Sequence, residues 1–417
     1  MRYPIVSTVF LCMLFSCNFA MATEDGFVSL FNGRDLTGWS PKGGDAIFRV
    51  EDGNIVGTVN DAIRNTFLCT EKEYENFIFK AEFKYDIGFN SGIQFRSQAQ
   101  PWADARWANE QRERVYGYQC EMAPQANTGL IWDEFRRRRW LNDRTPELVE
   151  KTISAFKQGE WNELVIQCIG PSIRTWLNGQ PITDIFDTET ARGFFGLQVH
   201  SHRGEGQIRW RNIRVKELPA TPWQPFFKDR QFVGLEVKPP GKWAFQEDGT
   251  VHATATSGEN RDGLILSREE FDNFAVRVSF KPVRGRSGLS FRSQEIDRPH
   301  WVRGLRCVIA GDHTAGALWD VGGGPNQGGR GWVFLPTEET NAANIKPTEW
   351  NELSVVAVGD RIVTILNGAH VVDMIDPVGL KSGKTALRLQ GGADVEYWFR
   401  DYEIMPLTKE MVDLIVR

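Results

Sequence analysis

The chain has 417 residues, of which 25% are charged and 41% are hydrophobic. This is the composition of an ordinary globular protein, and it excludes an intrinsically disordered or collagen-like chain. The length suits two domains of about 200 residues. The net charge of -5, without any basic block, argues against nucleic acid or an anionic membrane as the main partner. The 15 Trp, 27 Phe and 40 Gly residues favour many short strands joined by turns.

Residues 1–22 have the pattern of a signal peptide. Arg2 precedes an apolar run over residues 5–15, which is too short to cross a bilayer. An A-x-A pattern over residues 20–22 predicts cleavage there and a mature start near Thr23. Residues 14–17 resemble a lipoprotein box, although with a poor fit, so lipid anchoring is the alternative. We therefore expect an exported protein, periplasmic or extracellular, with no transmembrane segment.

Four cysteines follow residue 22, too few for a disulfide framework in a chain of this length. No C-x-x-C motif and no His/Cys cluster with zinc spacing is present. We therefore expect buried thiols, or at most one bridge, for Cys69, Cys120, Cys168 and Cys307.

The rest of the chain is one sequence unit written twice. Four segments recur in the same order and at a nearly constant offset: residues 74–80 and 271–277, 91–98 and 287–294, 160–164 and 349–353, and 177–179 and 366–368. This pattern indicates a tandem domain duplication, not a short-period solenoid. We predict domains over residues 23–218 and 226–417. The Pro-containing linker at residues 219–225 should be the first site of proteolytic cleavage.

Both units have the pattern of antiparallel strands. Residues 77–84 alternate in hydrophobicity with period two, as in a half-buried strand, and residues 164–168 and 353–357 form similar faces. Asn-Gly pairs at 178–179 and 367–368 predict hairpin turns, because both residue types tolerate positive φ. Thr145-Pro146-Glu147 predicts a capped helix through Lys151. Many strands with little helix predict antiparallel sandwiches.

A series of motifs in the first unit carries a family resemblance. The motifs are FNGxxLxGW at residues 31–39, NSGIQFR at 90–96, GYQCE at 117–121, GLIWDE at 129–134 before an arginine run at 136–139, WN at 161–162 and LNG at 177–179. Together they resemble the 3-keto-disaccharide hydrolase domain family, formerly a domain of unknown function. The resemblance covers nearly the whole mature chain as two copies. It implies an all-β fold of two concanavalin-like jelly-roll β-sandwiches in tandem, a bacterial envelope or secreted location and action on oxidised sugars.

Comparison of the two copies identifies candidate site residues. Residues kept in both copies read as scaffold, and they include Gly92 with Gly288, Trp161 with Trp350, and Arg96 with Arg292. Several polar residues of the first copy are lost or altered in the second: Gln119, Glu121, Glu134, Gln198 and His200. The second copy has, in the same order, Arg306, Val308, Val321, Arg388 and Gln390. Residues two apart share one strand face, so Gln119 lies beside Glu121 and Gln198 beside His200, with Cys120 and Val199 facing the core. We therefore predict a polar concave face on the first copy, while the second copy keeps a structural role.

The resemblance implies chemistry on a 3-keto-glycoside. The ketone acidifies the C2 hydrogen, so a base can form an enolate that expels the C1 aglycone, and hydration of the enone completes a net hydrolysis. Such a site needs a base, an acid and hydrogen-bond donors to the enolate. We assign Glu121 and His200 as base and acid in either order, with Asp133 as the alternative base. The candidate substrate-binding residues are Gln119, Glu134, Arg137, Gln198, Arg96 and Trp132.

Other readings of the site remain open. No cofactor is predicted, although the spacing of His200 and His202 is compatible with a divalent metal. A retaining glucanase would need Glu-x-Asp-x-x-Glu on one strand, and the nearest match, at Glu270 and Asp272, has Ala275 in place of the second Glu. The main alternative is a non-catalytic carbohydrate-binding protein, which would keep aromatic platforms and lack an acid/base pair. The partner in either case is a carbohydrate.

Overall fold

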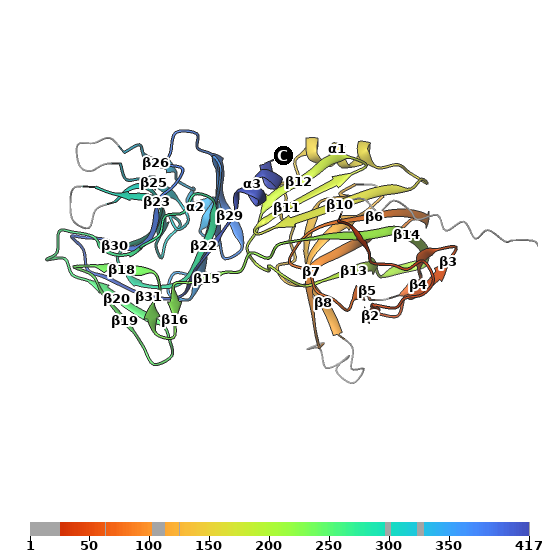
Figure 1. The fold of residues 1–417 in the computed structure, drawn as a ribbon, viewed down its shortest axis with the longest axis horizontal. Coiled ribbons are helices and arrows are strands. Elements are labelled where there is room, and N and C mark those ends of the chain that lie inside the picture. Colours follow the sequence, from red (N-terminus) through yellow and green to blue (C-terminus); the bar gives the residue numbers. More distant parts are fainter. Residues whose placement is uncertain are drawn as a thin grey trace, which may run out of the picture.

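The computed structural model describes residues 26–62, 64–101, 113–124, 126–296, 302–322 and 329–416. Antiparallel strands make up most of two lobes that lie side by side, with the first copy of the repeat in one lobe and the second copy in the other (Figure 1). The predicted signal peptide lies outside the described residues. In the part of the chain that the structure describes, no helix is both long and apolar enough to cross a membrane.

The first copy is a sandwich of two antiparallel sheets. The order of its eight-stranded sheet is β12 (Gln180–Phe186), β11 (Ser172–Leu177), β10 (Asn162–Ile169), β6 (Asn76–Ile87), β14 (His202–Leu218), β4 (Asn54–Ala62) and β3 (Ile47–Glu51), and β1 (Val28–Ser29) pairs with β14. The order of its six-stranded sheet is β2 (Trp39–Gly43), β5 (Thr66–Thr70), β13 (Phe194–Val199), β7 (Ser91–Pro101), β8 (Glu113–Met122) and β9 (Ile131–Glu134). All neighbouring strands of these two sheets pair in antiparallel fashion, which confirms the predicted all-β fold class.

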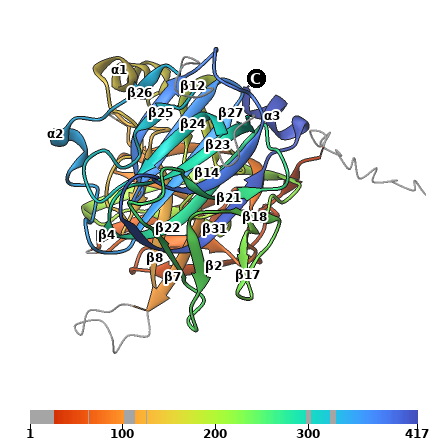
Figure 2. The same ribbon diagram turned by 90° about the vertical axis from the view of Figure 1, so that its left-hand side faces the viewer.

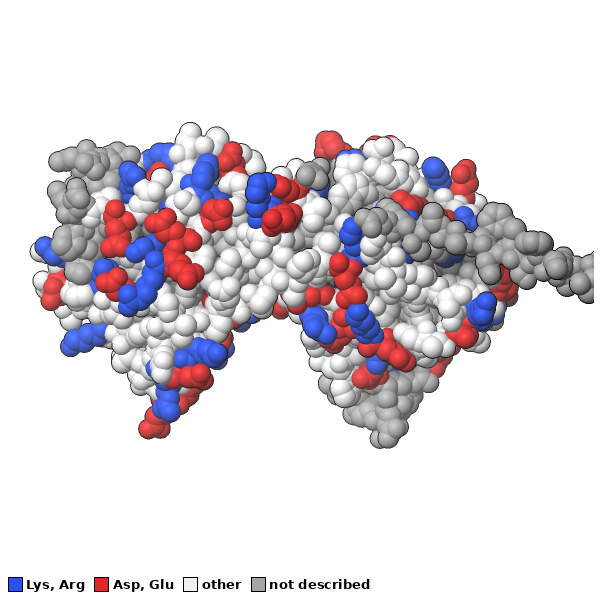
Figure 3. Space-filling view, in the orientation of Figure 1, with Lys and Arg blue, Asp and Glu red and all other residues white. Residues whose placement is uncertain are grey.

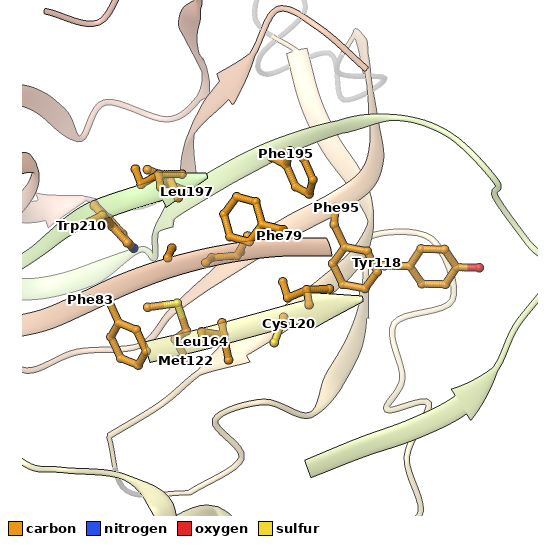
Figure 4. Close-up of a cluster of buried hydrophobic side chains, with 14 of the residues drawn as sticks. Phe79, Phe83, Phe95, Tyr118, Cys120, Met122, Leu164, Phe195, Leu197 and Trp210 are labelled. Carbon is orange, nitrogen blue, oxygen red and sulfur yellow. The ribbon is translucent and has the colours of Figure 1, made fainter. Parts of the chain in front are cut away.

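The core of the first copy lies between these sheets (Figure 4). Phe77, Phe79 and Phe83 are fully buried on one face of β6. Leu164, Ile166 and Cys168 of the neighbouring strand β10 project from the same face of the sheet. Phe195 of the other sheet packs on Phe79 with ring centroids 4.5 Å apart. The alternation seen in the sequence therefore marks the buried face.

The second copy repeats this architecture. Its eight-stranded sheet has the order β19 (Lys242–Phe245), β20 (Val251–Ala255), β31 (Val395–Pro406), β22 (Phe274–Arg284), β27 (Asn351–Val358), β28 (Arg361–Leu366) and β29 (Ala369–Ile375), with β15 (Gln224–Pro225) paired to β31. Its seven-stranded sheet has the order β18 (Leu235–Lys238), β21 (Gly263–Ser267), β30 (Lys384–Leu389), β23 (Ser287–Glu295), β24 (Val302–Ile309), β25 (Leu318–Asp320) and β26 (Gly331–Phe334). A small hairpin is formed by β16 (Phe227–Lys228) and β17 (Gln231–Phe232).

Both Asn-Gly pairs form hairpin turns, as predicted. Asn178 and Gly179 have φ of 49° and 78° between β11 and β12, and Asn367 and Gly368 have φ of 50° and 74° between β28 and β29. Positive φ at both positions is the geometry that the right-handed twist of a tight hairpin requires.

Three helices accompany the strands in the described parts of the chain. Helix α1 (Pro146–Ala155) begins at the predicted cap, where the Thr145 side chain accepts a hydrogen bond from the Leu148 backbone nitrogen, but it continues one turn beyond Lys151. Helices α2 (Glu338–Asn341) and α3 (Lys409–Val416) were not predicted.

The two lobes share an apolar interface. Val356, Val358, Val363 and Ile365 of the second copy point away from its own core and form a separate buried cluster with Phe186 of the first copy. Helix α3 contributes Met411 and Ile415 to the same cluster and lies between the lobes in Figure 1. Strands β27 and β28 are therefore buried on both faces, which fixes the second copy against the first.

The segment that joins the copies is held by hydrogen bonds. The Asn76 side-chain nitrogen donates to the Pro219 carbonyl at 2.6 Å and to the Thr221 hydroxyl at 2.7 Å. The Thr221 backbone nitrogen donates to the Glu75 carboxylate at 2.7 Å, and Thr221 is buried. This segment is thus docked on the first copy, and proteolysis there is less favoured than its composition suggests.

Charges of both signs are interspersed on the face of the molecule shown in Figure 3. Neither lobe presents a continuous stripe of lysines and arginines on this face.

Candidate functional site

The six-stranded sheet of the first copy has a polar outer face. Gln94 of β7, Gln119 of β8 and Trp132 of β9 are cross-strand neighbours, and Gly92 lies between Glu121 and Gln198 in the next row. Side chains of opposed residues project from the same face of a sheet. The structure therefore brings together the polar residues of β8, β9 and β13, while Cys120 and Val199 lie in the core behind them.

This face is partly enclosed because the sheet curls until β2 and β8 are in contact. The Lys42 ammonium of β2 forms an ion pair with the Glu113 carboxylate of β8 across the face. Beside this ion pair lies a pocket of about 220 Å³, lined among others by Asn65, Phe67, Arg114, Val115, Phe135 and His200. The pocket is the candidate ligand site of the first copy.

Glu121 ends a chain of amide hydrogen bonds. The Gln94 amide nitrogen donates to the Gln119 oxygen at 2.8 Å, and the Gln119 nitrogen donates to the Glu121 carboxylate at 2.9 Å. The Asn90 amide also donates to Glu121. Burial raises the pKa of Glu121, and the two donated hydrogen bonds oppose that shift by favouring the ionised form.

Glu134 is a second buried carboxyl on the same face. It accepts hydrogen bonds from the Asn65 amide at 3.2 Å and from the Trp132 indole nitrogen at 2.9 Å. Burial, helped by the negative charge of Glu121, raises the pKa of Glu134 to about 7. The negative charge of Glu121 therefore favours the protonated form of Glu134.

His200 lies at the pocket and not against Glu121. Its Nδ1 is 2.6 Å from the Ser201 carbonyl oxygen, and burial lowers the pKa of its imidazole, with a smaller contribution from His202. The Ser201 backbone nitrogen donates to Asn65 at 2.8 Å, so Asn65 connects the His200 segment to Glu134. His202 packs on the Phe89 ring, and among the described residues no group of three His, Cys, Asp or Glu side chains could hold a metal ion.

Gln198 is fully buried on the polar face. Neither its amide oxygen nor its amide nitrogen has a hydrogen-bond partner among the described residues. A buried amide without partners costs free energy. Gln198 thus has an unpaired amide on the polar face, although it is not among the residues that line the pocket.

Asp133 and Arg137 do not join the polar face. Asp133 is completely buried and is paired with both Arg136 and Arg137. Arg137 also binds the Asp187 carboxylate at 2.8 Å and the Gly368 carbonyl of the second copy at 3.2 Å. The prediction that Arg137 binds the substrate does not fit this geometry, because its donors are already used by Asp133, Asp187 and the Gly368 carbonyl.

Arg96 also lies away from the polar face. Its guanidinium donates to the Glu75 carbonyl at 2.7 Å, the Gly170 carbonyl at 2.8 Å and the Asn76 side chain at 3.1 Å. Arg292 makes the corresponding contacts in the second copy, to the carbonyls of Asp272 and Gly359. The geometry gives this arginine a structural task in both copies, since it joins the two sheets at one end of each sandwich.

Sequence reasoning missed three polar residues of the face: Asn65, Asn90 and Gln94. Each of them binds a predicted residue. A signal was available, because the register of the strands places Asp262, Arg286 and Ser290 at the same positions of the second copy. Asn90 and Gln94 belong to the motif at residues 90–96, and Gln94 lies in the repeat over residues 91–98, where the second copy has Ser290; Asn65 lies outside the recognised segments.

Three of the solved structures that are similar to the chain each align with less than half of it. A proposed glycosyl hydrolase from Parabacteroides distasonis ATCC 8503 is 21% identical, with 46% of this chain and 94% of that chain covered and a TM-score of 0.32. The carbohydrate-binding module CBM66 from Bacillus subtilis is 19% identical, with 41% and 95% covered and a TM-score of 0.32. A Bacillus subtilis protein of unknown function with a galectin-like fold is 13% identical, with 44% and 94% covered and a TM-score of 0.33.

No curated protein is significantly similar to the chain. The profile of the 3-keto-alpha-glucoside-1,2-lyase-like domain, however, matches residues 26–216 and again residues 222–405. The two matches account for nearly all of the chain after the predicted signal peptide, and they support a carbohydrate-related function. The chain therefore belongs to the 3-keto-alpha-glucoside-1,2-lyase-like family, whose domain it contains as two tandem copies.

Proposed function

We propose that the first copy cleaves 3-keto-glycosides by elimination and hydration on its polar face, next to the pocket lined by Asn65 and His200. The observation that carries this proposal is the pair of buried carboxyls, Glu121 and Glu134, whose pKa values are both raised. Carboxyls of this kind are suited to proton transfer near neutral pH. The second copy has Val308 and Val321 at these positions, so the activity belongs to the first copy.

The two carboxyls have different environments, and this difference suggests their roles. Glu121 accepts hydrogen bonds from Asn90 and Gln119, which favour the carboxylate, so Glu121 is the base that removes the C2 proton. Glu134, with a pKa of about 7, is the acid that protonates the leaving oxygen at C1. The sequence left Glu121 and His200 as base and acid in either order; this proposal pairs Glu121 with Glu134 instead, because the charge of Glu121 raises the pKa of Glu134.

The reaction balances without a cofactor. Removal of the C2 proton gives an enolate, which re-forms the C3 carbonyl as the C1–O bond breaks and a C1–C2 double bond forms. Water then adds its hydroxyl to C1 and its proton to C2, so the net change is hydrolysis. The unpartnered Gln198 amide is the donor that would stabilise the enolate oxygen, and His200 at the pocket wall would position the water.

The test is turnover of a 3-keto-glucoside by the full chain and by Glu121→Gln and Glu134→Gln. Both variants keep side-chain shape but cannot transfer a proton, so each should lose at least about a hundredfold in turnover. Glu352→Gln is the matched control, since Glu352 is a carboxyl of the second copy whose pKa is also raised by burial. It should retain wild-type turnover.

The same experiment separates catalysis from binding alone. If the folded Glu121→Gln and Glu134→Gln proteins turned over substrate at the wild-type rate, the acid/base assignment would be wrong. If the wild-type chain bound 3-keto-glucosides without converting them, the first copy would be a carbohydrate-binding domain.

A further inference from the structure

The second copy carries a cationic cluster where the first copy has its polar face. Arg306 of β24 and Arg388 of β30 take the positions of Gln119 and Gln198, and Asp262 takes that of Asn65. A Cβ added to Gly288 would lie 2.7 Å from Arg306 Cδ, just as one added to Gly92 would lie 2.7 Å from Gln119 Cδ. Arg306 therefore crosses the same part of the sheet that Gln119 crosses in the first copy.

The charges of this cluster do not balance. Asp262 accepts two hydrogen bonds from Arg388, at 2.5 and 2.9 Å, and a third from the Gly391 backbone at 2.9 Å. The nearest approach of Arg306 to Asp262 is 3.7 Å, which is too long for a hydrogen bond. Arg306 Nε is buried without a partner among the described residues, and only 12% of the side chain is exposed. One guanidinium is thus left without an anion of its own.

An aromatic pair continues the same row of residues. Arg306 lies opposite Trp319 of β25, and Trp319 lies opposite Trp332 of β26, so all three side chains project from one face of adjacent strands. These strands are on the side of the second copy that faces the viewer in Figure 2. The two indole rings meet edge to face with centroids 4.9 Å apart, and Trp332 is 43% exposed. The row offers an apolar platform beside a cation.

We propose that this face of the second copy binds an acidic saccharide, with the anionic group on Arg306 and the sugar ring on Trp319 and Trp332. A buried, poorly paired guanidinium costs free energy that a carboxylate or sulfate group would recover. The apolar face of a pyranose ring packs well on an indole. The first copy keeps the aromatic pair, as Trp132 opposite Trp140 with ring centroids 5.3 Å apart, but has Gln119 in place of Arg306. The two copies would therefore select saccharides of different charge.

The test is calorimetric titration of the full chain with methyl glucuronide, methyl glucoside 6-sulfate and neutral methyl glucoside. At least one acidic glycoside should bind about tenfold or more tightly than the neutral one, the usual effect of a charge-assisted hydrogen bond. The stronger of the two acidic ligands identifies the anion as a carboxylate or a sulfate. Arg306→Gln, which installs the residue of the first copy, should abolish the preference. Arg303→Gln, an exposed change on the same strand, should leave it unchanged.

Trp332→Ala supplies a second measurement that does not depend on a buried residue. This change should weaken the binding of the acidic glycosides and leave the binding of inorganic sulfate unchanged. Equal affinity for acidic and neutral glycosides, or a preference that survives in folded Arg306→Gln, would overturn the proposal. If inorganic sulfate bound as tightly as the glycosides and Trp332→Ala changed nothing, saccharide recognition would be excluded. None of these outcomes depends on turnover by the first copy.

Discussion

Glu134 shows how the surroundings of a single residue change its chemistry. Its carboxyl is buried beside the carboxylate of Glu121, and its hydrogen bonds come from uncharged donors, Asn65 and Trp132. The folded protein therefore holds the Glu134 proton more tightly than the unfolded chain does. A pKa raised to about 7 links the stability of the first copy to pH.

Between about pH 4.5 and pH 7 the unfolded chain releases this proton while the native state keeps it, so stability should fall as pH rises. The full difference is at most about 3 kcal/mol. Glu134→Gln removes the titrating carboxyl, so its melting temperature should fall less than that of the wild type between pH 5 and pH 8. Thermal unfolding across this range is the measurement, with the exposed Glu205→Gln as a control that follows wild type. Parallel curves for wild type and Glu134→Gln would contradict the linkage.

For single residues, sequence periodicity predicted which side chains share the polar face but not which groups are their hydrogen-bond partners. The two-residue spacing of Gln119 and Glu121 is enough to place them together. Asp133 pairs with its neighbours Arg136 and Arg137, but the other partners of Arg137, Asp187 and the Gly368 carbonyl, are distant in the chain. Long-range ion pairs of this kind leave no local pattern in the sequence.

The strands and their tight turns were the most predictable elements, because period-two hydrophobicity and Asn-Gly pairs act locally. The double burial of β27 was not predicted. Its residues 355–358 are continuously apolar, Val-Val-Ala-Val, whereas the matching residues 166–169 of the first copy include Gln167. A continuous apolar run is the signal of a strand covered on both faces, and here Phe186 and helix α3 cover the outer face.

The two Asn-Gly hairpins form a matched pair for mutation. Gly179 and Gly368 have φ of 78° and 74°, so replacement by Ala should cost each about 1 kcal/mol of unfolding free energy. A Cβ at Gly179 would meet nothing within 4 Å, but a Cβ at Gly368 would lie 2.9 Å from Arg137 Cδ.

Chemical denaturation of both variants would measure this difference. Gly368→Ala should be the more destabilising change, because it also disturbs the contact of Arg137 with the second copy. Equal losses would show that Arg137 adapts without cost. A larger loss in Gly179→Ala would contradict the interface geometry.

On the scale of the whole molecule, the two copies should unfold together. Phe186 of the first copy is 1% exposed and belongs to the cluster between the lobes, not to the core of its own sandwich. Its backbone carbonyl also lies 2.7 Å from His370 Nε2 of the second copy. Burial and polar contact at one residue couple the two sandwiches.

Phe186→Ala should lower the free energy of unfolding by about 3–5 kcal/mol, the usual effect of emptying a buried aromatic site. The loss should weaken the interface between the copies. In differential scanning calorimetry the wild type should show one transition and Phe186→Ala two, as the lobes become independent. Phe232→Ala, in the small hairpin of the second copy, is the control and should keep a single transition. Two transitions in the wild type would show that the interface does not couple the copies.

The buried cysteines give each lobe its own chemical reporter. Cys69, Cys120 and Cys168 lie within the first copy and Cys307 within the second, and burial holds the pKa of every one of these thiols above its usual range. Because only the thiolate reacts with alkylating reagents, labelling of these positions must await a local opening of the surrounding structure. The rate at which each cysteine gains an alkyl group, followed by peptide mass spectrometry, therefore times the opening of each lobe separately in the unmodified protein.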